Sequence, residues 1–558
     1  MLLGLLVLQL FAQKPDPDRI DRPTESGNIP NPYDNWPEAF VSADTNGVMM
    51  PEGYLKEQYN RLFIRPYEYE AIYNRLKSIK EKSMAGERGF KYGSEQDSLA
   101  LVSLYHATHG DYWKDNSNWL DSPLFPLFQP GEWDATSWYG IKVTHSGVRE
   151  MDLRHNQLTG WMPPEIGDLS NLKGFDLYSN RLTGSIPEKI GNLNNLLWLN
   201  LSANRLTGSI PGKIGDLNDL QYLDLARNQF IGKLPAEIGN LGDLKYLYIA
   251  GNRLTGSIPA GLGNLNQLER LVLSNNQFSG SIPPEMGQLS KLQDLNLGRN
   301  QLTGNLPAEI GNLNSLQSLI LADNRLTGSI PAEISNLSNL RWLHLSGNQL
   351  CGSIPSELTN LSNLSVLELD RNGLTGSVPS ELSNLSQLRI FRVSDNRLSG
   401  LPDLSSLANL SLCDISNNNF DFDDLARSNI SAEEFIYAPQ ACIAVERQEE
   451  NEQLTLKYTG EGSNNTYQWY NGDTQLSGET DSILTISDTA DGAYYCKASN
   501  ENFPDLTLQT APEEAGNSGT TKGIITAEYE ALVDFYNATD GETWDESGLW
   551  LSDTLVAL

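Results

Sequence analysis

The chain has 558 residues, of which 71 are acidic and 39 are basic, so its formal net charge is −32. This acidity excludes a nucleic-acid partner, because binding to a phosphate backbone draws its affinity from clustered lysine and arginine. The four cysteines show no CxxC or other metal-binding spacing, and they are too few for a disulfide-dense scaffold.

The first residues of the chain have the pattern of an export signal. Residues 2–12, LLGLLVLQLFA, are almost wholly apolar and end in a small residue before a polar run. The stretch is too short to span a bilayer, which needs about 20 residues, so we predict a signal peptide over residues 1–13. The alternative is a buried N-terminal strand. No other apolar run approaches the length of a membrane span, and we expect a secreted or cell-surface protein.

The segments that follow carry no recognisable chemistry. Residues 14–65 are interpreted as a linker, and residues 66–93 as an amphipathic helical segment with a proline in its first turn. Residues 94–146 are predicted to form an N-terminal cap, in which a helix over residues 99–105 closes the end of the next domain with its apolar face. The tryptophans of this cap are predicted to be core residues rather than a ligand site: Trp113, Trp119, Trp133 and Trp138.

A repeat of constant length dominates the centre of the chain. An asparagine recurs at a step of 24 residues from Asn156 to Asn396, within the pattern L-x-x-L-x-x-L-x-L-x-x-N-x-L-x-G-x-I-P. The alternation of Leu199 and Leu201 predicts a short strand with one face inward. The asparagine can satisfy backbone groups that are left unpaired where the chain turns. One unit buries too little apolar surface to offset the entropy of its own ordering, so the units must stack.

This pattern is that of leucine-rich repeats, and its L-x-G-x-I-P signature resembles the plant-type class of that family. The resemblance implies a concave parallel β-sheet, a second short strand ladder from the L-T-G segments, and 3₁₀ turns on the convex side. We therefore predict an α/β repeat solenoid with its C-terminal cap over residues 147–436. The segments that flank the repeats resemble the caps of bacterial leucine-rich repeat proteins, which favours a bacterial surface protein.

Residues 437–510 change to short alternating strands separated by turns. The order of Trp469 and Cys496 resembles an immunoglobulin-like domain, so the solenoid is expected to be followed by a small all-β sandwich. The first half departs from that family, because Leu456 stands where a cysteine would complete the usual disulfide. Two alternatives are open: Cys442 and Cys496 form a disulfide, or both are free thiols.

The end of the chain repeats an earlier segment. Residues 531–551 align without gaps to residues 100–120 at a constant offset of 431, and the match includes two tryptophans. We interpret residues 511–524 as a linker and residues 525–558 as the start of a second leucine-rich repeat cap, inside which the given sequence stops.

The outward strand positions of the solenoid are the candidate binding site. The residue before the first strand leucine is aromatic in three consecutive repeats, at Trp198, Tyr222 and Tyr246, which predicts an exposed aromatic ridge with side chains about 4.8 Å apart. Asp176 and Asp224 border it two positions later. Such a surface is typical of a binding hot spot or a sugar-stacking platform, although aromatic residues also stabilise neighbouring strands. The remaining candidates extend the ridge or form a lesser patch: Tyr178 and Tyr248, then Trp342 and His344.

These features predict a non-catalytic extracellular binding protein that holds a protein or peptide on the concave face, with Asp176 and Asp224 selecting a basic group. The alternative is a surface adhesin or structural spacer that binds glycans through the same aromatic residues. An enzyme is not expected, because the sequence lacks HExxH, GxSxG, P-loop and GxGxxG motifs. No cofactor or metal site is expected.

Overall fold

The computed structural model describes residues 95–117, 119, 138–144, 147–450, 453–487 and 490–515. The predicted signal peptide, the first linker, the helical segment before the cap, the second cap and Trp133 lie outside these residues. Within the described ranges, no helix is both long enough and apolar enough to cross a bilayer.

The N-terminal cap is built on helix α4 (Glu95–Ala107) and the short 3₁₀ helix η1 (Gly110–Tyr112). Trp113, Trp119 and Trp138 are all buried, and the rings of Trp113 and Trp119 lie 4.7 Å apart. The indole N–H of Trp113 donates to the carbonyl of Thr108 at 3.0 Å. These three tryptophans are therefore core residues of the cap, as predicted.

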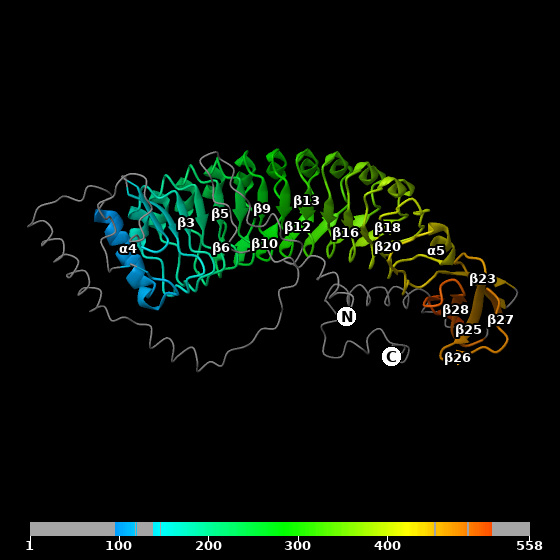
Figure 1. Ribbon diagram of the computed structural model, residues 1–558. Helices are drawn as coiled ribbons and strands as arrows, with labels where there is room; N and C mark the ends of the chain where they lie inside the picture. The colour runs from blue at the N-terminus through cyan, green and yellow to red at the C-terminus, as the bar shows by residue number, and fades with distance from the viewer. Residues whose placement is uncertain are drawn as a thin grey trace, which may run out of the picture. The chain divides into compact units, whose positions relative to one another are not determined.

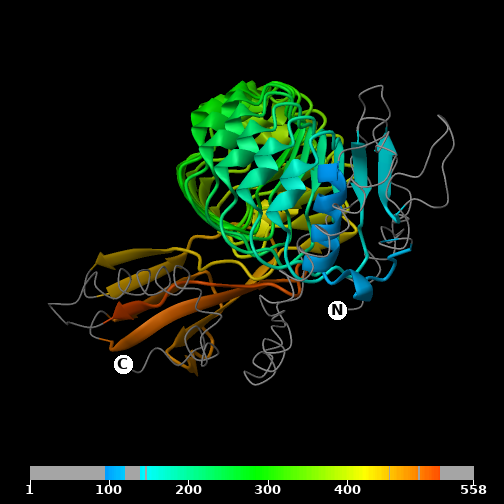
Figure 2. The ribbon, with the colours of Figure 1, turned by 90° about the vertical axis from the view of Figure 1, so that its left-hand side faces the viewer.

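The repeats that follow stack in chain order and form one long main sheet (Figures 1 and 2). Its two N-terminal strands are antiparallel and all later neighbours are parallel. Its fourteen strands, in spatial order, are β1 (Ile141–Thr144), β2 (Gly147–Asp152), β3 (Gly174–Asp176), β4 (Trp198–Asn200), β5 (Tyr222–Asp224), β7 (Tyr246–Tyr248), β9 (Arg270–Val272), β11 (Asp294–Asn296), β13 (Ser318–Ile320), β15 (Trp342–His344), β17 (Val366–Glu368), β19 (Ile390–Arg392), β21 (Leu412–Asp414) and β22 (Glu434–Ile436).

A second parallel sheet and a column of 3₁₀ helices complete the coils, so the predicted solenoid is confirmed. The strands of the second sheet are β6 (Ile231–Lys233), β8 (Arg253–Gly256), β10 (Gln277–Gly280), β12 (Gln301–Asn305), β14 (Arg325–Gly328), β16 (Gln349–Gly352), β18 (Gly373–Gly376) and β20 (Arg397–Leu398). The helices are η2 (Pro164–Asp168), η3 (Glu188–Asn192), η4 (Gly212–Asp216), η5 (Ala236–Asn240), η6 (Ala260–Asn264), η7 (Pro284–Gln288), η8 (Ala308–Asn312), η9 (Ala332–Asn336), η10 (Ser356–Asn360) and η11 (Ser380–Asn384).

The glycine of the repeat lies where the strands of the second sheet end, as Gly256 does at the end of β8. Gly208 has a φ of 76°, in the left-handed region that favours glycine. A Cβ atom at this position would also lie 3.2 Å from the Cβ of Ser185 in the preceding repeat. Pro211 then precedes η4 with a φ of −69°, a value that its ring fixes in advance.

The recurring asparagine forms a ladder of side-chain hydrogen bonds through the solenoid. Asn228 Oδ1 accepts from the backbone N–H of Leu206 in the preceding repeat at 2.9 Å. Its amide group donates to the carbonyls of Leu201 and Leu225, at 3.0 and 3.2 Å. The predicted role of the asparagine, pairing backbone groups at the turn, is confirmed.

A glutamine ends this ladder at the C-terminal side. Gln440 Oε1 accepts from the backbone N–H groups of Asn418 and Phe420, at 3.1 and 3.3 Å. Its amide nitrogen donates to the carbonyl of Ile415 at 3.0 Å. Helix α5 (Phe422–Ser428), capped by the side chain of Asp421, lies between the last asparagine and this glutamine. Gln440 therefore takes the place of the next asparagine, which the sequence did not reveal.

Two antiparallel sheets follow the solenoid. One contains β23 (Val445–Glu450), β24 (Gln453–Tyr458) and β27 (Ile483–Ser487). The other contains β25 (Asn465–Asn471), β26 (Thr474–Gln475), β28 (Gly492–Asn500), β29 (Thr507–Gln509) and β30 (Glu513–Ala515). Strand β30 pairs with β28, so this sheet continues past residue 510, where we expected a linker.

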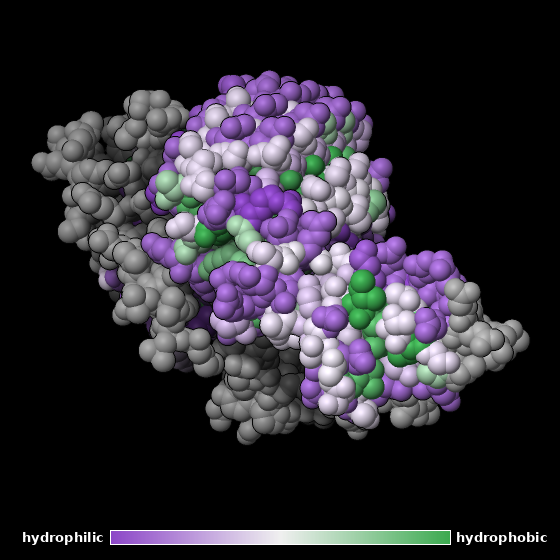
Figure 3. Space-filling view, turned by 90° about the vertical axis from the view of Figure 1, so that its right-hand side faces the viewer, coloured by the Kyte–Doolittle hydropathy of each residue, from purple (hydrophilic) through white to green (hydrophobic). Residues whose placement is uncertain are grey.

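The cysteines near these sheets are unpaired thiols. Cys496 is buried opposite Trp469 in the sheet register, whereas Cys442 is exposed, and neither forms a disulfide in the described chain. Of the two alternatives that the sequence left open, the structure shows free thiols. The surface at this end of the chain is largely hydrophilic, with small apolar areas, in keeping with the excess of acidic residues (Figure 3).

Candidate functional site

The strand register brings the predicted aromatic residues together on the outward face of the main sheet. Trp198 pairs with Tyr222, which pairs with Tyr246 on the next strand. The rings of Trp198 and Tyr222 are stacked, with centroids 3.7 Å apart and an angle of 3° between their planes. Tyr246 and Tyr248 lie at a tilt to Tyr222, at 6.1 and 5.7 Å. We call these four residues of β4, β5 and β7 the aromatic ridge.

The ridge is less accessible than the sequence predicted. Its four side chains have exposed fractions of 8% or less, and Tyr222 has none. Stacking is one cause, because parallel rings at 3.7 Å cover one face of each other. Hydroxyl groups are also engaged: Tyr246 donates to Glu269 at 2.9 Å and Tyr222 donates to Asp224 at 3.3 Å. A partner that uses the ridge must therefore replace contacts that these side chains already make.

The predicted carboxylates occupy the second outward row of the same strands. Asp152, Asp176, Asn200 and Asp224 are neighbours in the register. Burial, followed by the negative charge of Asp152, raises the pKa of Asp176 to about 7, although the backbone N–H of Tyr178 donates to it at 2.9 Å. Asp224 is fully buried and accepts from the backbone N–H of Ala226. Of the two predicted carboxylates, Asp176 is therefore the more accessible.

The pKa of Asp176 makes the stability of the chain depend on pH. Because the folded-state pKa exceeds the ordinary 3.8, the neutral carboxyl stabilises the fold, fully below about pH 4 and progressively less as the pH rises through about 7. The substitution Asp176→Asn replaces the carboxyl with an amide, which is neutral at every pH. We expect this variant to gain about 1 to 3 kcal/mol in free energy of unfolding at pH 8 and almost none at pH 4, since the side chain remains partly accessible.

Denaturant unfolding at the two pH values measures this difference. The matched control is Asp219→Asn, which changes an exposed carboxylate outside the row. Equal effects of the two variants at pH 8 would contradict the prediction.

The remaining predicted residues lie apart from the ridge. Tyr178 was expected to extend the ridge. It is half-buried, and its ring packs edge-on against His155 with the ring centroids 4.9 Å apart, away from the ridge. Trp342 and His344 lie on β15, with β9, β11 and β13 between them and the ridge. His344 Nε2 lies 3.2 Å from Glu368 Oε2. Glu368 and Glu269 were not among the predicted residues. The 24-residue step places Glu368 beside His344, and Glu269 directly precedes Arg270, the register neighbour of Tyr246.

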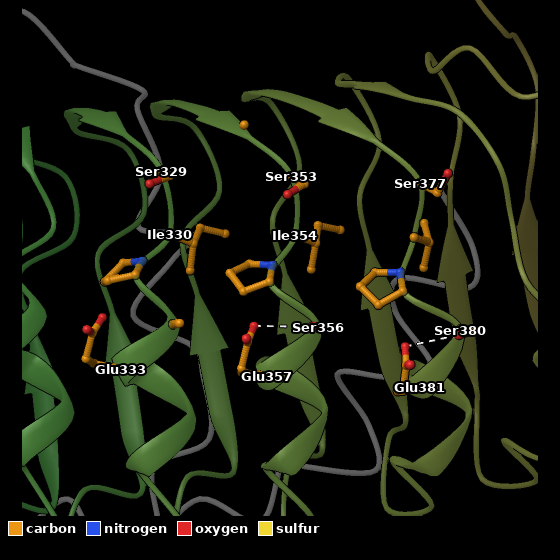
Figure 4. Close-up of a pocket in the computed structure, with 16 residues that line it drawn as sticks. Ser329, Ile330, Glu333, Ser353, Ile354, Ser356, Glu357, Ser377, Ser380 and Glu381 are labelled. Atoms are coloured by element: carbon orange, nitrogen blue, oxygen red, sulfur yellow. Dashed lines mark hydrogen bonds between the residues drawn. The ribbon is translucent and has the colours of Figure 1, made fainter.

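A groove on another side of the solenoid contains none of the predicted site residues (Figure 4). It has a volume of about 1080 Å³ and lies between the second sheet and helices η9, η10 and η11. Serine, isoleucine or valine, and proline from three successive Gly-Ser-(Ile/Val)-Pro segments line it. On its helical side, Glu357 and Glu381 accept from the hydroxyls of Ser356 and Ser380. Its residues are framework positions of the repeat, and it carries no distinct chemistry.

Within the described ranges, no three His, Cys, Asp or Glu side chains are grouped so that they could hold a metal ion. The site therefore consists of aromatic rings, carboxylates and hydroxyl groups on a rigid parallel sheet. Such an arrangement can stack on apolar or planar groups, accept hydrogen bonds and attract a positive charge.

Comparison with protein families matches the repeats. The family described as "Leucine-rich repeat region" matches residues 188–303. The family described as "Leucine rich repeat" matches residues 146–206 and 290–350, and a third, "Leucine Rich Repeat", matches residues 363–385. No curated protein matches the sequence.

Among solved structures, two plant proteins are similar to this chain. The LRR ectodomain of the membrane receptor kinase GASSHO1/SCHENGEN3 from Arabidopsis thaliana, in complex with CASPARIAN STRIP INTEGRITY FACTOR 2, is 30% identical with a TM-score of 0.50, over 62% of this chain and 47% of that one. The Arabidopsis receptor kinase HAESA, in complex with the peptide hormone IDA and the co-receptor SERK1, is 28% identical with a TM-score of 0.51, over 63% of each chain.

The chain thus spans about half to two thirds of the length of these two structures. The matched families agree with the 24-residue step of the sequence, and they agree with the parallel main sheet and the asparagine ladder of the structure. Residues 146–350 and 363–385 of this chain are therefore leucine-rich repeats.

Proposed function

We propose that this chain is a non-catalytic extracellular binding protein that holds a peptide or protein segment on the outward face of its main sheet. The observation that carries the proposal is the aromatic ridge on β4, β5 and β7, with Asp176 in the adjoining row. Stacked aromatic side chains beside a carboxylate supply both apolar contact and selection of a basic group. The similar plant structures contain a bound peptide hormone or a named factor, which supports a peptide ligand.

The test selects peptides from a displayed random library on the full chain and measures their affinity for ridge variants. We expect Trp198→Ala combined with Tyr246→Ala to weaken the selected peptide about tenfold or more, because centrally buried aromatic residues dominate such interfaces. The matched control is Trp161→Ala, which removes a 47% exposed tryptophan that forms an isolated bridge with Thr183, outside the main sheet. We expect no change there.

Three outcomes would count against this function or a part of it. Unchanged affinity in the ridge variant would mean that the peptide binds elsewhere. Competition by soluble oligosaccharides rather than by peptides would favour the alternative of an adhesin or spacer that binds glycans. Selected peptides that lack lysine and arginine would remove the role given to Asp176.

The two C-terminal sheets are proposed to form an immunoglobulin-like module. Trp469 and Cys496 are fully buried and face each other in the register of β25 and β28, and Leu456 of β24 is also fully buried. Tyr494 lies two residues before Cys496, and its hydroxyl donates to the carbonyl of Asp491. This placement supports the resemblance in the second half of the module. The bacterial origin inferred from the caps remains a prediction.

A further inference from the structure

The C-terminal half of the main sheet carries a second surface that the aromatic ridge does not reach. The register of β15, β17, β19 and β21 places Trp342, Val366, Ile390 and Leu412 side by side. Trp342 is 37% exposed, Val366 is 7% exposed, and Ile390 and Leu412 are half-buried. We call these four residues the apolar row. The accessible apolar surface is therefore centred on Trp342 and continues more weakly over Ile390 and Leu412. Exposed apolar surface that is shared by neighbouring residues is typical of an interaction site.

Arginines border one side of the apolar row. Arg341 and Arg389 directly precede Trp342 and Ile390 in the chain, and both are exposed. In the described ranges, no carboxylate forms an ion pair with either guanidinium group. A chain of net charge −32 therefore presents positive charge that is not neutralised at this place.

The other side of the apolar row is an ordered network of charged side chains. Glu368 lies between His344 and Arg392, with Oε2 at 3.2 Å from His344 Nε2 and Oε1 at 2.9 Å from Arg392 Nη1. Asp414 continues this line and accepts from the hydroxyls of Ser394 and Ser416. Glu368 and Asp414 are thus already engaged. Glu434, in register with Leu412 on β22, is exposed and puts negative charge at the far end of the row. Attraction for negative charge is therefore confined to the part of the row from Trp342 to Ile390, where Arg341 and Arg389 lie.

We propose that the apolar row binds an extended, acidic segment of a partner protein, with apolar side chains on the row and carboxylates on Arg341 and Arg389. The proposal rests on the proposed function, because it assumes that the main sheet is a binding face, and it adds the chemistry of the partner. Four strands at about 4.8 Å spacing span about 14 Å. In an extended chain, three apolar side chains at alternate positions also span about 14 Å, so the lengths match.

The aromatic ridge and the apolar row differ in charge, so they can be tested separately. The ridge adjoins Asp176, and its neighbour Arg270 is paired with Asp294 at 3.1 Å. The arginines beside the apolar row form no ion pair with a described residue. Strands β9, β11 and β13 separate them, which corresponds to about 20 Å between β7 and β15. A short peptide covers one surface or the other, but not both.

The experiment measures fluorescence anisotropy of a short labelled peptide against the full chain. The peptide has three leucines at alternate positions, separated by serines, and glutamates at both ends, because side chains between the leucines of an extended chain point away from the sheet. We expect binding that weakens about tenfold or more in Trp342→Ala and in the double variant Arg341→Glu with Arg389→Glu. Trp161→Ala is the control and should leave binding unchanged. A peptide with lysine in place of glutamate should bind about tenfold or more weakly.

Circular dichroism checks that the variants fold, and the arginine variants keep the test valid if Trp342→Ala does not fold. Absence of binding, or binding that neither change weakens, would overturn the proposal. Loss of binding in the ridge variant Trp198→Ala with Tyr246→Ala, and not in Trp342→Ala, would also overturn it while leaving the proposed function intact. Failure of the library-selected peptide to depend on the ridge would instead affect only the proposed function.

Discussion

Replacing Asn276 with alanine is expected to lower the free energy of unfolding by about 2 to 4 kcal/mol. Asn276 Oδ1 accepts from the backbone N–H of Leu254 at 3.1 Å, and its amide donates to the carbonyls of Ile249 and Leu273 at 3.0 and 3.1 Å. Each of these carbonyls also accepts from a neighbouring ladder asparagine, so each keeps one partner. The N–H of Leu254 loses its acceptor inside the solenoid, and this loss is the main cost.

Urea unfolding of the full chain, followed by circular dichroism, measures this change. The matched control is Asn266→Ala, in the same repeat, because Asn266 is exposed. It should alter the free energy of unfolding by less than about 0.5 kcal/mol. Equal effects of the two changes would mean that the ladder contributes little beyond the packed leucines. If the prediction holds, hydrogen exchange should show reduced protection in the repeat of Asn276 and in its neighbours, because repeats contact only adjacent units.

The solenoid could be predicted because its physical cause repeats every 24 residues. Leu199 and Leu201 reveal the inward face of a strand, Asn204 the ladder, and Gly208 the turn with positive φ. Each of these residues is fixed by backbone geometry or burial, which the sequence expresses directly. Gln440 could not be found in this way. It serves the ladder with a longer side chain and belongs to a segment that leaves the repeat pattern.

The candidate site was predictable in position but not in environment. The step of the repeat places Trp198, Tyr222 and Tyr246 in one row, and the register confirms that alignment. Burial of the rings and the hydroxyl bond from Tyr246 to Glu269 depend on side-chain rotamers and on neighbours in other rows. The pKa of Asp176 likewise depends on burial and on Asp152, which a pattern of residue types does not give.

The β-rich end of the chain was less predictable, because its contacts are not repeated. Alternating residues indicated the strands around Trp469 and Cys496, but no local pattern indicated that β30 would return to pair with β28. A strand as short as Glu513–Ala515 has too few residues to show a period of two. Whether Cys442 forms a disulfide also depends on its distance from Cys496 in the folded chain, which the spacing in sequence does not fix. In the structure both are free thiols.

Replacing Trp469 with alanine is expected to unfold the two C-terminal sheets while most of the solenoid stays folded. Trp469 is fully buried, and its indole N–H donates to the carbonyl of Asp481 at 2.9 Å. Removing a buried tryptophan costs about 3 to 5 kcal/mol, which is a large part of the stability of a small module. Hydrogen exchange of amides in β25 and β28, compared with those in β4 and β5, measures the effect. The control is Ile483→Ala, because Ile483 is 46% exposed.

The contacts between the solenoid and these sheets determine how far the damage spreads. The backbone N–H of Glu461 donates to Asp421 Oδ2 at 2.7 Å, and the rings of Phe422 and Phe503 lie 6.3 Å apart. Helix α5 should therefore lose part of its protection with the sheets. The effect should fade over the preceding repeats, since each is held by its own neighbours. An equal loss of protection in β4 and β28 would contradict this independence, because it would show that the chain unfolds as one cooperative unit.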